Sequence, residues 1–187
     1  MSAWDLPKST SINGTEYAIR SDYRAVLDVL TVMEDPELSD GERGAIAFEI
    51  FYPDYDEMPP SDYQQAAEFL QWFVNGGDAP KGKQKSKLAD WKQDFPLIVG
   101  PVNRVLGYEV RGCEYCHWWT FLGAYYEIGD CLFAQVVSIR KKKRKGKRLE
   151  KYEQEFYREN RELIDFKVEL TEEEKAFFEE WGCVRNG

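Results

Sequence analysis

Four residues in the middle of the chain have the types and spacing to bind a cofactor or a metal ion. Cys113, Cys116 and His117 form the pattern C-x-x-C-H, in which two thiols can attach a haem whose iron the histidine ligates. With Cys131 they would also supply the four thiolate and imidazole ligands that zinc prefers. The alternative is structural: two small buried thiols beside an aromatic helix, with a histidine that packs or caps.

We expect the structural role, and therefore no cofactor. Haem attachment takes place outside the cytoplasm, whereas residues 1–20 have no apolar segment of the kind that a secretory signal requires. The zinc interpretation lacks a second closely spaced pair of ligands. The thiols, including Cys183, are expected to be reduced rather than paired. Sequence alone leaves metal binding by Cys113, Cys116, His117 and Cys131 open.

Catalytic constellations are hard to find elsewhere in the sequence. There is one histidine, and there is no G-x-S-x-G, Walker or G-x-G-x-x-G motif. Neighbouring carboxylates such as Asp54 and Asp56, or those of residues 172–174, are typical of solvated loops and helix N-termini. We therefore expect a non-enzymatic protein.

A run of cations is the first candidate surface for a macromolecular partner. Residues 141–148 read KKKRKGKR, and we single out Lys141, Lys142, Lys143 and Arg144. Clustered cations can bind nucleic acid phosphates, but this run has no interleaved aromatic residues and the chain has a net charge of -9. The acidic segment that follows could neutralise the run within the fold. A solvated or protein-docking face is the expected role.

A surplus of aromatic residues is the second candidate surface. Aromatic residues make up 15% of the chain, which is more than one core needs. Tyr152, Phe156, Phe177 and Trp181 lie in acidic segments with helical periodicity, and such residues suit a groove or an oligomer interface that holds an amphipathic helix. The alternative is that they form a peripheral second core layer.

The element that must position these residues is a central helix predicted at residues 114–128 and ended by Gly129. Its apolar residues fall on two faces of a helix, which predicts burial from several sides. The first face comprises Trp118, Phe121, Leu122, Tyr125 and Ile128. The second face comprises Trp119 and Tyr126.

Turn and cap signals predict the remaining elements. Asn13 and Gly14 form the turn of an N-terminal hairpin, because both positions of that turn need a positive φ. Three helices are expected after capping boxes, which pair Ser39 with Glu42, Ser61 with Gln64 and Thr171 with Glu174. A further helix is expected after Ser21, and another from Asp90 with a bend or start at Pro96. From residue 131 to 164 either one helix or two, hinged at Gly146, are possible, with Leu132, Val136 and Ile139 facing inward. Alternation at residues 164–170 predicts an extended segment.

The predicted fold is mainly α: a single-domain helical bundle with a small N-terminal β-hairpin. The chain of 187 residues is long enough for one full core and short for two, so that residues 1–187 form one domain. No apolar window is long enough to cross a membrane, and with no signal peptide the expected location is the host cytoplasm. The predicted parts are a hairpin arm (1–20), N-terminal helices (21–76), a flexible basic loop (77–89), and core and C-terminal helices (90–187).

Several segments resemble the phage gene-product-fifteen family, which is encoded in the tail gene clusters of siphophages and prophages of Gram-positive bacteria. The resemblance extends over about residues 23–161. It is carried by YRAVLDVLTVME at 23–34, DFPLIV at 94–99, NRVLGYE at 103–109 and above all HWWTFLGAYYEIGD at 117–130.

The resemblance implies a role in tail morphogenesis. Proteins at that gene position are tail assembly chaperones, which bind the tape measure protein and keep it soluble while tail tube subunits polymerise. The expected partners are therefore the tape measure protein, with tail tube subunits and further copies of this chain as additional candidates. The alternatives are a nucleic-acid-binding regulator that uses residues 141–148 and a structural subunit of the finished tail. The family implies no catalytic residues.

Overall fold

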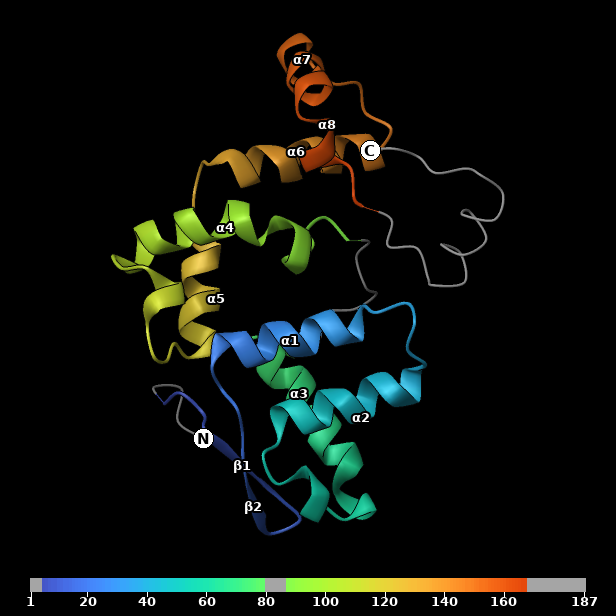
Figure 1. Cartoon of the computed structure of the whole chain (residues 1–187), viewed down its shortest axis with the longest axis vertical. Coiled ribbons are helices and arrows are strands. Elements are labelled where there is room, and N and C mark those ends of the chain that lie inside the picture. Colours follow the sequence, from blue (N-terminus) through green and yellow to red (C-terminus); the bar gives the residue numbers. More distant parts are fainter. Residues whose placement is uncertain (1–4, 80–86, 168–187) are drawn as a thin grey trace.

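The computed structural model describes residues 5–79 and 87–167, which are mainly helical and begin with a two-stranded antiparallel sheet, as predicted (Figure 1). None of the helices in these ranges has the length and apolar content that crossing a bilayer requires. The elements in order are β1 (Ser9–Ile12), β2 (Thr15–Ala18), α1 (Tyr23–Met33), α2 (Asp40–Phe51), η1 (Tyr55–Glu57), η2 (Pro60–Asp62), α3 (Tyr63–Val74), α4 (Trp91–Leu106), η3 (Val110–Gly112), α5 (Trp118–Tyr126), α6 (Leu132–Arg144), α7 (Lys151–Glu159) and α8 (Arg161–Ile164).

The hairpin turn is the predicted one. Asn13 and Gly14 have φ values of 50° and 87°, and β1 pairs with β2 on either side of them. The carboxylate of Asp62 then holds the hairpin against the start of α3, because it accepts hydrogen bonds from Asn13 Nδ2 and from the Tyr17 hydroxyl, both at 2.8 Å. The hairpin is thus attached to the helical part of the protein.

Two of the predicted helix caps are wrong, and the reason is the same in both cases. Asp22, not Ser21, caps α1, because the Ser21 hydroxyl instead bonds the hydroxyl of Tyr115 at 2.8 Å. The expected box of Ser61 with Gln64 is replaced by the 3-10 turn η2, and the Ser61 hydroxyl donates to Asp62. In both places the serine is drawn into another contact. The box of Ser39 with Glu42 at the start of α2 is confirmed.

The helix α4 runs through both of its prolines. It begins at Trp91, where the Asp90 carboxylate accepts from Gln93 N at 2.7 Å, so that Pro96 neither starts the helix nor ends it. It ends at Gly107, whose φ of 78° is the left-handed conformation that favours glycine.

The central helix α5 is shorter than predicted and begins at Trp118 rather than at residue 114. The preceding residues are extended because they pair with the chain before α1: Tyr23 N donates to Cys116 O at 2.9 Å, and Trp118 N donates to Ser21 O at 2.8 Å. This pairing between segments far apart in sequence prevents the helix from starting earlier.

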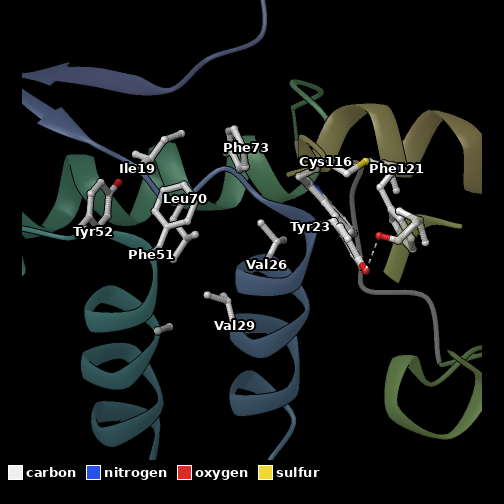
Figure 2. Packing of buried hydrophobic residues seen from close by; sticks show 14 of the residues in the cluster. Ile19, Tyr23, Val26, Val29, Phe51, Tyr52, Leu70, Phe73, Cys116 and Phe121 are labelled. Carbon is white, nitrogen blue, oxygen red and sulfur yellow. Dashed lines mark hydrogen bonds between the residues drawn. The ribbon is translucent and has the colours of Figure 1, made fainter. Parts of the chain in front are cut away.

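The predicted apolar face of α5 lies at the centre of the main core. Trp118, Phe121, Leu122 and Ile128 are buried, and Tyr125 is partly buried. Figure 2 shows side chains of α1, α2, α3 and α5 meeting there, with the ring of Tyr23 beside that of Phe121. Those two rings stack with centroids 4.6 Å apart. The second predicted face is only partly covered: Tyr126 is 70% exposed, which contradicts the predicted burial of this side of the helix.

Two indoles connect α5 to the end of α3. The final carbonyls of a helix have no partner within it and must find one elsewhere. Trp118 Nε1 donates to Val74 O at 2.9 Å, and Trp119 Nε1 donates to Phe73 O at 2.8 Å. Gly77, with a φ of 87°, follows close by, and a Cβ there would lie 3.0 Å from the Trp119 ring. Only glycine fits this approach.

The chain after α5 forms a smaller second cluster. Residues 141–164 do not form one helix, because α6 ends at Arg144 and Gly146 adopts a φ of 63°. Val136 and Ile139 of α6 pack with Ile164 of α8, whereas Leu132 is 44% exposed, which corrects its predicted inward position.

Three further predicted elements lie partly or wholly outside the described residues. Ile164 is helical, so the extended segment does not begin there, and residues 168–170 lie outside the described ranges. The predicted helix at residues 171–181 also lies outside them, as does most of the predicted basic loop, at residues 80–86.

A buried ion pair joins this second cluster to α4. Arg140 donates to both oxygens of Asp94, at 2.6 and 2.9 Å, and the two side chains are 4% and 0% exposed. Arg140 also donates to the carbonyls of Leu163 and Ile164, while the ring of Phe166 lies 4.2 Å from the guanidinium carbon. One side chain therefore holds α4, α6 and α8 together.

Removing one member of this pair should destabilise the protein strongly. An unpaired buried charge typically costs about 3–5 kcal/mol, so we expect losses of that order in the free energy of unfolding for Asp94→Ala and for Arg140→Met. The double variant should lose less than the sum of the two. Urea unfolding measures all three, and additive losses would contradict the coupling. The exposed pair of Arg158 and Glu155 is the control, and Glu155→Ala should change stability by less than about 1 kcal/mol.

Candidate functional site

The C-x-x-C-H motif has a structural role. His117 Nε2 donates to Pro7 O at 2.9 Å, and His117 Nδ1 accepts from Trp119 N at 3.0 Å. Both ring nitrogens are therefore occupied, and the imidazole caps the first turn of α5, which was one of the predicted alternatives. Cys113 Sγ donates to Val110 O at 2.9 Å, and the buried Cys116 Sγ accepts from the Tyr108 hydroxyl at 3.8 Å.

Metal ligation by these residues finds no geometric support. Within residues 5–79 and 87–167, no three His, Cys, Asp or Glu side chains are grouped so that they could hold a metal ion. Cys131 stands apart at the start of α6, where it is the N-cap residue. Cys113, Cys116 and Cys131 are free thiols, and Cys183 lies outside the described residues.

The predicted cationic run is partly neutralised within the fold. Lys142 Nζ lies 2.7 Å from the carboxylate of Glu153, and Lys143 Nζ lies 2.5 Å from that of Asp165. The hydrogen bond from Lys142 lowers the pKa of Glu153. Lys141 and Arg144 are exposed on α6. Lys142 and Lys143 of the run therefore take part in internal ion pairs.

Of the four predicted aromatic residues, the two that the structure describes have different surroundings. Tyr152 is 64% exposed on α7, whereas Phe156 packs against the cluster of Val136, Ile139 and Ile164. Phe156 thus belongs to the second core layer, which was the alternative to partner binding. Phe177 and Trp181 lie outside the described residues.

The structure instead places an open hollow of about 880 Å³ between α1 and α2. Ile19, Ala25, Ile46 and Ile50 supply its apolar surface, and the ring of Tyr115 lines one wall. Ile46 is only half-buried and is not among the residues packed against the core, so its side chain is free to contact a partner. We call this hollow the α1–α2 groove.

Hydrogen bonds fix the walls of the α1–α2 groove. Arg20 Nη1 donates to Ile50 O at 2.8 Å and to Glu49 O at 2.5 Å, which ties the segment after β2 to the end of α2. Arg24 Nη2 donates to Cys113 O at 2.7 Å, which ties α1 to the segment before α5. The groove is thus formed by the folded protein rather than by loose side chains.

The rim of the α1–α2 groove is charged with both signs. The lining residues include three cations and three carboxylates: Lys8, Arg20, Arg24, Asp22, Asp28 and Glu49. An apolar floor with a mixed rim suits the apolar face of an amphipathic helix, whose polar flanks meet the rim. It is less suited to a small charged ligand, because the opposite charges on the rim lie close to one another, as in the 3.2 Å pair of Arg24 and Asp22.

The groove was not predicted from the sequence, although a signal existed. Apolar residues of α2 lie on two faces: Ala47, Phe48 and Phe51 are buried, whereas Ile46 and Ile50 are only half-buried. A short helix with apolar residues beyond its core face is a candidate docking surface.

The buried His117 should make stability depend on pH. Burial lowers the pKa of His117 below its ordinary value of about 6.5. Between that value and the lower pKa of the folded state the unfolded chain binds more protons, so stability is complete at neutral pH and falls as the pH decreases below about 6.5.

His117→Asn isolates this effect, because asparagine keeps an oxygen that can accept from the first turn of α5 but does not titrate. Urea unfolding between about pH 7 and pH 5 should show a smaller pH dependence for the variant than for the wild type. Equal slopes would assign the dependence to other groups.

In a comparison with protein families, the family described as Bacteriophage Gp15 protein matches residues 4–101. The match covers just over half of the 187 residues and includes β1, β2, α1, α2 and α3. The comparisons with curated proteins and with solved structures gave no match. The chain therefore belongs to the Bacteriophage Gp15 protein family.

Proposed function

We propose that this protein is a non-enzymatic tail assembly chaperone that binds the tape measure protein in the host cytoplasm during tail morphogenesis. Family membership supports a phage structural or tail-related protein. The α1–α2 groove is the observation that supports binding of the tape measure protein. All of its lining residues except Tyr115 fall within the matched residues 4–101. The basic residues 141–148 fall outside them.

The dimensions of the groove support an amphipathic helix as the bound segment. An α-helix is about 10 Å wide and rises 5.4 Å per turn, so an open hollow of about 880 Å³ has room for one face of a segment of about two turns. Two turns place about two or three apolar side chains on the floor formed by Ala25, Ile46 and Ile50. A contact of this size is smaller than that of a permanent interface, which suits capture followed by release.

The charge of the protein supports the same function. A tape measure protein that waits for assembly exposes apolar helix faces that would otherwise associate with one another. The net charge of -9 on each bound copy would keep such a complex dispersed through mutual repulsion. Tail tube subunits would displace the chaperone when they assemble around the same helix.

A charged residue on the floor of the groove should weaken capture. We expect Ile46→Glu to reduce the affinity for a tape measure fragment by at least about tenfold, because burial of one isoleucine contributes about 1.5–3 kcal/mol. The measurement is co-expression with fragments of the tape measure protein, followed by pull-down and titration calorimetry.

Val105→Glu is the matched control. Val105 is an exposed apolar residue of α4 that does not line the groove. Its substitution should leave both binding and stability nearly unchanged. Equal loss of binding in the two variants, or a wild type that retains no fragment, would contradict the proposal.

A further inference from the structure

The charges of this protein are separated along the chain. Residues 5–79 contain sixteen carboxylates and four cationic side chains, which gives this segment a net charge of -12. Residues 140–151 contain nine cationic side chains and one carboxylate, which gives a net charge of +8. The overall charge of -9 therefore hides two strongly and oppositely charged regions.

The fold places these two regions far apart. In Figure 1 the longest axis is vertical, and α6 and α7 lie at the top while the hairpin and the connection between α2 and α3 lie at the bottom. A basic surface at one end cannot neutralise the acidic surface at the other end of the same molecule. A second copy of the chain can.

Each region contains a compact set of charges that is free to bind a partner. We define the basic end as Lys141, Lys145, Lys147 and Arg148, and the acidic corner as Glu49, Asp54, Asp56 and Glu57. All eight residues are exposed, and none takes part in an ion pair between residues that the structure describes. The neighbouring Lys142 and Lys143 are paired internally, and they are not part of the basic end.

The acidic corner has a second property that suits cations. Tyr55 lies between Asp54 and Asp56, and its ring is 5.8 Å from that of Tyr63, which is 36% exposed. Negative charge on Asp56 and Glu49 raises the pKa of Tyr55, after larger effects of Tyr63 and burial, so these carboxylates act on the same ring. Lysine and arginine side chains bind such a combination of carboxylates and aromatic faces.

We propose that the basic end of one copy binds the acidic corner of the next copy, so that the protein self-associates from head to tail. Such a contact joins two different surfaces, and every open oligomer keeps one free basic end and one free acidic corner. The oligomers therefore grow with protein concentration until they close into a ring or continue as a filament. A nucleic acid partner is disfavoured, because the run has no interleaved aromatic residues and the remainder of the chain repels phosphates.

Salt screening determines whether the attraction between the basic end and the acidic corner exceeds the repulsion between two negatively charged molecules. At 0.15 M salt the Debye length is about 8 Å, so touching patches attract while the more distant carboxylates are largely screened. At about 1 M salt the Debye length falls to about 3 Å and the attraction itself is weakened. Association should therefore be present at physiological salt and absent at high salt.

The test is sedimentation velocity of the purified protein, without any tape measure fragment, across a range of salt and protein concentrations. One variant reverses the basic end and combines Lys141→Glu, Lys145→Glu, Lys147→Glu and Arg148→Glu. A second variant reverses the acidic corner and combines Glu49→Lys, Asp54→Lys, Asp56→Lys and Glu57→Lys.

Each variant alone should be monomeric, with an association constant at least tenfold below that of the wild type, because like charges then face each other at the contact. An equimolar mixture of the two should associate again, since the reversed end of one complements the reversed corner of the other. A third variant with Glu114→Lys, Glu127→Lys and Asp130→Lys changes net charge in the same direction as the second and should associate like the wild type.

Three results would overturn the proposal. The first is a wild type that is monomeric at about 0.15 M salt, where the contact should be strongest. The second is a mixture that stays monomeric although circular dichroism shows that both variants are folded. The third is a wild-type complex whose ultraviolet absorbance shows that it contains nucleic acid and that dissociates after nuclease treatment. None of these results bears on capture of the tape measure protein, which is measured separately.

Discussion

The start of α5 is the point on which the arrangement of this protein depends. The side chains of three consecutive residues there bond two other parts of the chain: His117 holds the segment before β1 through Pro7 O, and Trp118 and Trp119 donate hydrogen bonds to the last carbonyls of α3. The main chain of the same residues pairs with the segment before α1. Because helix ends leave backbone groups without partners, these side chains satisfy a requirement that water would otherwise meet. Packing and hydrogen bonding thus favour the same arrangement.

This arrangement separates two surfaces with different properties. The α1–α2 groove is built on the elements that converge at α5, and its walls are fixed by Arg20 and Arg24. The basic end lies beyond the ion pair of Asp94 and Arg140, on helices that pack around a separate cluster. The apolar floor of the groove and the charged contact for a second copy use different residues, and of the charged residues that line the groove only Glu49 also belongs to the acidic corner.

The sequence predicted correctly the turns and caps that depend only on interactions between neighbouring residues. The turn at Asn13 and Gly14 and the box of Ser39 with Glu42 were found because each depends on neighbouring residues alone. The misplaced caps and the late start of α5 have the opposite origin. Ser21 bonds to Tyr115, and Cys116 pairs with Tyr23, and no local pattern contains contacts between residues so far apart.

The candidate sites also divide into those that depend on neighbouring residues and those that depend on distant contacts. Internal neutralisation of the cationic run by the acidic segment after it was foreseen, and it holds for Lys142 and Lys143. The role of His117 was left between ligand, packing and cap, because only its bonds to Pro7 and Trp119 decide it. The groove was not predicted: Ile46 and Ile50 indicated an apolar surface on α2, but the hollow itself depends on the position of α2 beside α1.

Hydrogen–deuterium exchange of the protein with and without a tape measure fragment would show whether the α1–α2 groove is the binding surface. A bound helix should slow the exchange of backbone amides in α1 and in α2, whose outer face it covers. The amides of α6 and α7 should be unchanged under conditions that keep the protein monomeric. Protection confined to α6 and α7, with α1 and α2 unaffected, would contradict the account.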